Sequence, residues 1–214
     1  IALSDPNKSG TVTKALEQII QQQMQLAIEE VRAEWRKDPM SYRGGEKEVA
    51  DKGVAIGWER GLQLIQRICA NARYFTDAAT KIPLEVAQGD AAAGMCIDFY
   101  GRFQSEAIRV GDAPSRLQYF TPAGGSSVGV DPIALFRGAP NAEAAKMFVE
   151  FVLSLEGQKL WDFKVGTPGG PVQYALRRQP IRKELYAPEY VSYRSDPGVD
   201  PYEEAKSFMY HPKW

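Results

Sequence analysis

The sequence Ser4-Asp5-Pro6-Asn7-Lys8-Ser9-Gly10-Thr11 follows the short apolar run Ile1-Ala2-Leu3 and opens a long helical pattern. The apolar run predicts a strand, and Asp-Pro-Asn predicts a turn. The first amides of a helix have no acceptor within the helix, and the helix dipole makes this end partly positive. Ser9, Gly10 and Thr11 therefore predict a cradle for a phosphate, phosphonate or carboxylate group. The same residues also fit a plain turn in which Ser9 or Thr11 only caps the helix.

Helical periodicity continues on both sides of a loop at residues 37–45. Apolar residues recur at three- and four-residue steps over residues 10–36, with glutamines and charges opposite. A second helix is predicted over residues 46–72, with a break near Gly53 or Gly57. A short helix over residues 83–88 should end at Gly89.

Strand patterns alternate with these helices. We predict strands at residues 73–76, 91–97, 117–120 and 129–136, and further helices after Asn141, over residues 154–163 and over residues 201–210. This alternation is typical of an α/β protein.

The composition of the chain excludes some classes of protein. The chain has 214 residues, enough for one large or two small domains, and its 26 basic and 27 acidic residues give a net charge of -1. No overall field therefore draws it to nucleic acid. No apolar run approaches the roughly 20 residues that span a bilayer. Cys69 and Cys96 lack the spacing of a metal site, so free thiols are the expected state.

Residues for catalysis are scarce. The single histidine, His211, lies near the end of the chain, and the sequence has no G-x-S-x-G elbow, Walker loop or G-x-G-x-x-G motif. Hydroxyls and backbone amides recur instead at turns between strands and helices, at Ser9-Gly10-Thr11, Thr76-Asp77 and residues 98–101. In an open α/β sheet such turns line a ligand crevice. This pattern favours a binding protein without cofactor or metal over an enzyme.

Four segments carry a family resemblance: residues 1–11, residues 84–94 (Leu-Glu-Val-Ala-Gln-Gly-Asp-Ala-Ala-Ala-Gly), residues 124–145, and residues 153–158 (Leu-Ser-Leu-Glu-Gly-Gln). Together they make the chain similar to the later part of an extracellular solute-binding protein of an ABC importer. The resemblance is to the type II two-lobe group, which includes ferric-iron, phosphonate and sugar-phosphate binders.

The resemblance implies an α/β periplasmic-binding-protein type II fold, with one complete lobe and the returning part of the other. Residues 1–121 would form the second, inserted lobe, residues 122–165 the return crossover and first-lobe helices, and residues 166–214 a Pro/Gly/Tyr-rich extension. An N-terminal segment of about one lobe would be missing. The protein would be periplasmic or extracellular and would deliver a small anionic solute to a membrane permease.

The resemblance also implies a set of ligand contacts. Ser9, Gly10 and Thr11 would hold the anion, Asp98 and Tyr100 would contact the rest of the ligand, and Ser126 and Ser127 would add donors at the crossover.

Three alternatives remain open from the sequence. A ferric-iron or other metal carrier would use Asp98 and Tyr100, but iron-binding relatives have two adjacent tyrosines where this chain has Phe99-Tyr100. An enzyme acting on a phosphorylated substrate would share the α/β fold. The chain could also be only a scaffold or interaction piece.

Overall fold

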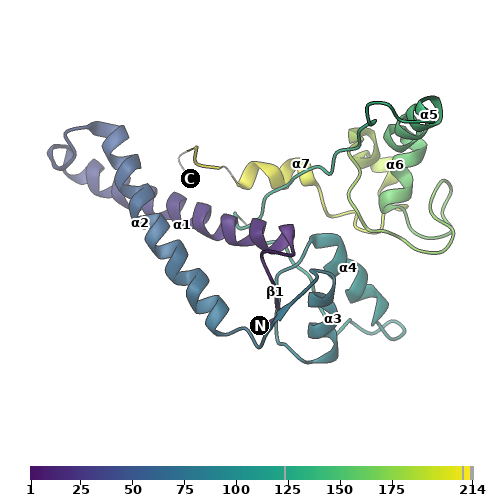
Figure 1. The fold of residues 1–214 in the computed structure, drawn as a ribbon, viewed down its shortest axis with the longest axis horizontal. Coiled ribbons are helices and arrows are strands. Elements are labelled where there is room, and N and C mark those ends of the chain that lie inside the picture. The colour runs from purple at the N-terminus through teal and green to yellow at the C-terminus, as the bar shows by residue number, and fades with distance from the viewer. Residues whose placement is uncertain (123, 209, 213–214) are drawn as a thin grey trace. The chain divides into compact units, whose positions relative to one another are not determined.

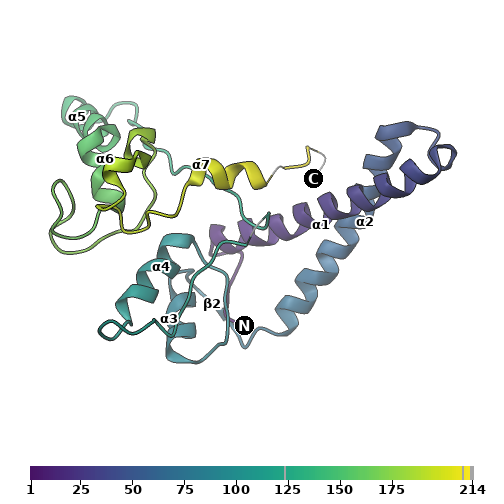
Figure 2. The same ribbon diagram turned by 180° about the vertical axis from the view of Figure 1, so that it is seen from behind.

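A computed structural model describes residues 1–122, 124–208 and 210–212 (Figures 1 and 2). The chain divides into two compact units. The first unit comprises Ile1–Ser127 together with the chain from Lys206 onward, and the second comprises Val128–Ala205.

A small parallel sheet lies at the start of the first unit. Strand β1 (Leu3–Ser4) pairs in parallel with β2 (Phe75–Thr76), with Leu3 opposite Phe75 and Ser4 opposite Thr76. On the other side of β1, Ala2 forms a parallel bridge with Gly94. A Cβ atom at residue 94 would lie 2.4 Å from the Ile82 side chain, so glycine permits this close approach.

Two long antiparallel helices connect β1 to β2. Helix α1 (Gly10–Lys37) and helix α2 (Gly45–Ala70) are joined through a short 3-10 helix, η1 (Pro39–Ser41). Figure 1 shows α1 and α2 crossing. A core cluster of Val31, Tyr42 and Val49 packs near their linked ends.

The crossing depends on three buried glycines of α2, Gly53, Gly57 and Gly61, which are spaced four residues apart. A Cβ atom at residue 57 would lie 2.3 Å from the Cα atom of Met24 on α1. The predicted break near Gly53 or Gly57 is therefore wrong: α2 is continuous, and its glycines serve close helix contact. The predicted first helix is confirmed, one residue longer than expected.

Two shorter helices complete the first unit. Helix α3 (Lys81–Gln88) ends at Gly89, which has a positive φ of 86°, as predicted for its C-cap. Helix α4 (Asp98–Ala107) begins after the segment that bridges to Ala2. Both views show α3 and α4 beside the sheet (Figure 2).

The second unit is built from helices α5 (Ala142–Leu153) and α6 (Leu155–Asp162), the 3-10 helices η2 (Lys183–Tyr186) and η3 (Pro188–Tyr190), and helix α7 (Pro201–Glu204). Its core contains a buried ion pair, in which Arg194 donates to Asp162 over 2.8 Å. Helix α5 has no buried residue among those described, and its Met147, Phe148 and Phe151 are exposed.

Three predicted strands do not form. Residues 117–120 and 129–136 have no strand structure, and residues 91–97 contribute only the single bridge at Gly94. A strand must pair its backbone N–H and C=O groups with a neighbouring strand. Residues 129–136 are exposed throughout, and no described strand lies beside them. The sequence pattern identified apolar segments, but it could not show whether a partner strand lies beside them.

The last predicted helix is also shorter than expected. Over residues 201–210 the chain forms α7 and then the 3-10 helix η4 (Ala205–Ser207). Residue 209, within the predicted range, lies outside the described residues. The described structure is thus largely helical, and the α/β type II lobe arrangement stays a prediction, as does the division at residues 121 and 165.

Candidate functional site

The carboxyl ends of three parallel segments meet at one edge of the small sheet. Ser4 ends β1, Thr76 ends β2, and Gly94 leads toward Asp98, the first residue of α4. Helix α1 begins a few residues after Ser4. The parallel pairing therefore brings the turn before α1 and the turn before α4 to the same edge, where open α/β sheets hold their ligands.

The turn between β1 and α1 is fixed by its own hydrogen bonds. The backbone N–H of Asn7 donates to the Asp5 carboxylate over 2.9 Å, and the N–H of Lys8 donates to the Asp5 carbonyl over 2.9 Å. The Thr13 hydroxyl donates to the carbonyl of Pro6 over 2.8 Å. This is a tight Asx-type turn, and it holds the entry to α1 in one conformation.

Ser9 is the N-cap residue of α1, yet its side chain does not cap the helix. The residue is 7% exposed, and its hydroxyl oxygen is buried without a hydrogen-bond partner among the described residues. Buried hydroxyls almost always have a partner, so an unpaired one marks either strain or an absent binding partner. Ser9 therefore occupies the N-cap position without a side-chain capping hydrogen bond, and its ligand role stays a prediction.

Backbone N–H groups without a described protein acceptor follow Ser9 in the first turn of α1. Within the described residues, the first backbone N–H of α1 that meets a protein acceptor is that of Thr13, which donates to the Ser9 carbonyl over 3.2 Å. The N–H groups of Gly10, Thr11 and Val12 lack such an acceptor. The space beside Gly10 is open, because a Cβ atom there would meet nothing within 4 Å. Unpaired amides in the first turn of a helix are suited to binding an anion.

Asp98 and Tyr100 lie at the start of α4. Arg102, one turn further along, is buried and donates to the Asp98 carboxylate over 2.5 Å. Tyr100 is half-buried, and its ring lies 4.3 Å from that of Phe99, centroid to centroid. The Asp98 carboxylate is thus shared with a cation rather than free.

Arg102 and Tyr119 lie beside Asp98 and Tyr100 but were not predicted from the sequence as site residues. The Arg102 guanidinium lies 5.2 Å from the Tyr119 ring centroid, and Tyr119 packs against Gly101, where a Cβ atom would lie 2.4 Å from the ring. Burial raises the pKa of Tyr119. The four-residue spacing of Asp98 and Arg102 was a usable signal, because such a pair lies on one face of a helix.

Of the two crossover serines, Ser127 contacts α1 away from the Ser9 turn. Ser127 accepts hydrogen bonds from the Gln18 side chain and from Tyr210, the latter over 3.3 Å. Gln18 lies nine residues beyond Ser9, which corresponds to about 13 Å along an α-helix. Ser126 is half-buried. The structure therefore separates Ser127 from the Ser9 turn, and the ligand role of both serines stays a prediction.

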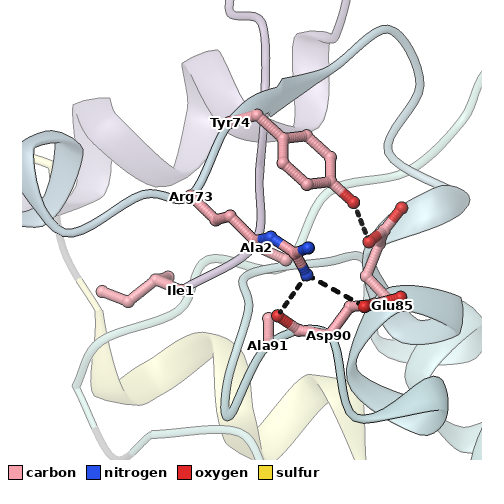
Figure 3. Close-up of a pocket in the computed structure, with 7 residues that line it drawn as sticks. All are labelled: Ile1, Ala2, Arg73, Tyr74, Glu85, Asp90 and Ala91. Carbon is pink, nitrogen blue, oxygen red and sulfur yellow. Dashed lines mark hydrogen bonds and ion pairs between the residues drawn. The ribbon is translucent and has the colours of Figure 1, made fainter.

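A surface depression lies at the opposite, amino edge of the sheet (Figure 3). Its lining residues are Ile1, Ala2, Arg73, Tyr74, Glu85, Asp90 and Ala91. Arg73 is paired with the Asp90 carboxylate over 2.9 Å, and Tyr74 donates to Glu85. Because these polar groups satisfy one another, the depression offers a ligand fewer unmet partners than the Ser9 turn does.

The described residues provide little for nucleophilic or metal chemistry. Both cysteines are free and half-buried, and burial together with nearby Asp98 raises the pKa of the Cys96 thiol to about 11. This thiol is therefore protonated at neutral pH and is a poor nucleophile. Among the described residues, no group of three or more His, Cys, Asp or Glu side chains is arranged to hold a metal ion.

We compared the sequence with models of known protein families. The model of the bacterial extracellular solute-binding protein family matches residues 8–177, well over half of the chain. The chain belongs to this family. Neither the curated proteins nor the solved structures gave a match.

Membership of the bacterial extracellular solute-binding proteins agrees with the predicted class of protein and location. Such a protein acts in transport, in the periplasm or outside the cell, and the family implies a small ligand and an ABC permease as partners. Its members are typically not enzymes. In the described part of the chain, the helices are too short or too polar to cross a membrane.

Proposed function

We propose that this solute-binding protein captures a small anionic solute, carrying a phosphate, phosphonate or carboxylate group, on the turn that opens α1. The unpartnered, buried hydroxyl of Ser9 is the observation that carries the proposal. A buried polar group without a partner costs about 1–3 kcal/mol, and a ligand that accepts its hydrogen bond removes this cost.

The anion would accept hydrogen bonds from Ser9 and from the backbone N–H groups of Gly10, Thr11 and Val12. The dipole of α1, a helix of 28 residues, adds to the attraction within its first turn. No charged side chain is needed for this arrangement, because oriented amides alone make a site for an anion.

Asp98 and Tyr100 would contact the remainder of the solute. Asp98 is partly exposed and would accept a hydrogen bond from a polar ligand group, whereas its partner Arg102 is buried. Hydroxyl groups of a sugar or polyol suit Asp98 and the Tyr100 hydroxyl, since a hydroxyl both donates and accepts.

A ferric-iron carrier is less well supported. It would need several anionic oxygen ligands, whereas Asp98 is neutralised by Arg102 and position 99 is a phenylalanine. Iron loading followed by a visible absorption spectrum separates the two: a tyrosinate-to-iron band would favour the carrier.

Thermal unfolding of the protein with a panel of compounds tests the proposal. We expect phosphate, a phosphate ester or a phosphonate to raise the melting temperature. A ligand at 100 times its dissociation constant should stabilise the folded protein by about 2.7 kcal/mol. Neutral sugars and polyamines are the comparison set. A shift with these compounds and none with any anion would refute an anionic ligand.

A further inference from the structure

The chain passes between its two compact units twice, at Ser127–Val128 and at Ala205–Lys206. Within the first unit, both of these connections are tied to the same stretch of α1. Ser127 accepts a hydrogen bond from Gln18, and the chain after Lys206 returns to contact α1 as well.

We call residues 206–208 and 210–212 the C-terminal strap. Its Phe208 is buried, and the backbone of His211 makes two hydrogen bonds with the Gln21 side chain. In these bonds the His211 N–H donates to the Gln21 carbonyl oxygen over 2.6 Å, and the Gln21 amide donates to the His211 carbonyl over 3.4 Å. Gln21 is fully buried, so this pairing satisfies a polar group inside the protein.

The strap and the 124–127 loop also contact each other. The Tyr210 hydroxyl donates to the Ser127 hydroxyl oxygen over 3.3 Å, and Lys14 of α1 lies 4.5 Å from the Tyr210 ring centroid. Positions 14, 18 and 21 fall on one face of a helix. A single polar face of α1 therefore holds the loop that leaves the first unit and the strap that returns to it.

We propose that this face of α1, Ser127 and the C-terminal strap form a clamp that ties the two connections together and restricts the motion of the second unit. Two connections that are fixed at one place leave a tethered unit fewer orientations than two independent flexible linkers do. The two hydrogen bonds of Ser127 lie nearer the surface than the buried Gln21 pairing, and bonds at a surface open locally at low cost.

The clamp makes a distinctive prediction, because Ser127 and Tyr210 join two segments that are far apart in the sequence. Loss of the Tyr210 hydroxyl should loosen the 124–127 loop, and loss of the Ser127 hydroxyl should loosen the strap. A strap that merely packs on α1 would show neither cross effect.

Amide hydrogen exchange of the whole protein, followed by mass spectrometry, measures these effects. We expect Tyr210→Phe to speed exchange in the peptide that covers residues 124–128, and Ser127→Ala to speed exchange in the peptide that covers residues 206–212. Loss of one hydrogen bond predicts an increase of about fivefold. Gln23→Ala, on the same helix but outside the clamp face, is the matched control and should leave both peptides unchanged.

A second measurement reports on the motion of the second unit and needs no ligand. Spin labels are placed at Lys47 and Glu143, whose side chains are 82% and 85% exposed, after Cys69 and Cys96 are replaced by alanine. We expect a wider distance distribution for Ser127→Ala and Tyr210→Phe than for the parent and Gln23→Ala. Exchange changes confined to each substituted segment, or equal distributions in all variants, would overturn the clamp.

Discussion

The side-chain oxygens of Ser4 and Thr76 lie 3.2 Å apart, buried across the two strands of the parallel sheet. Thr76 donates its own hydroxyl proton to the Ala78 carbonyl over 3.0 Å, so Ser4 must be the donor in this pair. Both hydroxyls are therefore used inside the protein. Ser9, at the same edge of the sheet, is the buried hydroxyl without a protein partner among the described residues.

This difference predicts an unusual effect of Ser9→Ala on stability. Replacing a serine that caps a helix normally costs about 0.5–2 kcal/mol. Here the cap hydrogen bond is absent, and the substitution removes an unsatisfied buried hydroxyl. We expect the ligand-free variant to be as stable as the parent, or more stable by about 1 kcal/mol.

Urea unfolding of the ligand-free protein measures this change. Thr13→Ala is a useful comparison, because the Thr13 hydroxyl does bond to the turn, at the Pro6 carbonyl. It should lose stability. If Ser9→Ala lost as much, Ser9 would be an ordinary capping residue.

The helix α1 and its entry turn could be predicted from the sequence, because a long apolar period and Asp-Pro-Asn are local signals. The unpaired state of Ser9 could not be predicted, since it depends on where every neighbouring acceptor lies. The contacts of Ser127 could not be predicted from the sequence either. Its place in a Gly-Gly-Ser-Ser loop suggested a ligand contact. Its hydrogen-bond partners Gln18 and Tyr210 are distant in the sequence, so no local sequence pattern could predict them.

The close crossing of α1 and α2 predicts that Gly57→Ala is destabilising. The added Cβ atom would lie 2.3 Å from the Met24 Cα atom, and backbone cannot move aside as a flexible side chain can. Alanine favours helix over glycine by about 1 kcal/mol, so propensity alone would stabilise the variant. We expect the cost of overpacking to exceed the gain in helix propensity, so that the free energy of unfolding falls by about 1–3 kcal/mol.

Thermal unfolding followed by circular dichroism tests this prediction. Gly10→Ala is the matched control, because its Cβ atom would meet nothing within 4 Å. The control should melt at or above the temperature of the parent. Equal melting temperatures for both variants would mean that α1 and α2 do not approach as closely as described.

The glycines of α2 explain why the predicted helix break was wrong. Gly53 and Gly57 predicted a break, since glycine is a poor helix former. Tertiary contact reversed that preference, because only glycine allows the two helix backbones to approach so closely. The four-residue spacing through Gly61 was the signal that could have indicated it.

The ion pair in the second unit predicts a pH dependence. Burial raises the pKa of Asp162 from 3.8 to about 6, against the opposing effect of Arg194. The folded protein therefore keeps a proton on Asp162 between about pH 4 and 6 that the unfolded chain has released. The stability from this group is complete below pH 3.8 and is lost as the pH rises through about 6.

Differential scanning calorimetry of the parent and of Asp162→Asn between pH 4 and 7 measures this contribution. We expect the melting temperature of the parent to fall relative to that of the variant as the pH rises, with no further relative change above the pKa of Asp162. Parallel curves over the whole range would show that Asp162 does not titrate there.

Calorimetric titration tests most directly whether Ser9 contacts a bound anion. The probes are inorganic phosphate, methylphosphonate and glycerophosphate, added to the parent, to Ser9→Ala and to the control Ser41→Ala, whose exposed hydroxyl lies in the loop between α1 and α2. We predict that at least one probe binds the parent and Ser41→Ala equally and binds Ser9→Ala about tenfold or more weakly, as expected for a lost hydrogen bond to a charged group. Equal affinity of such a probe for the parent and Ser9→Ala would contradict the account.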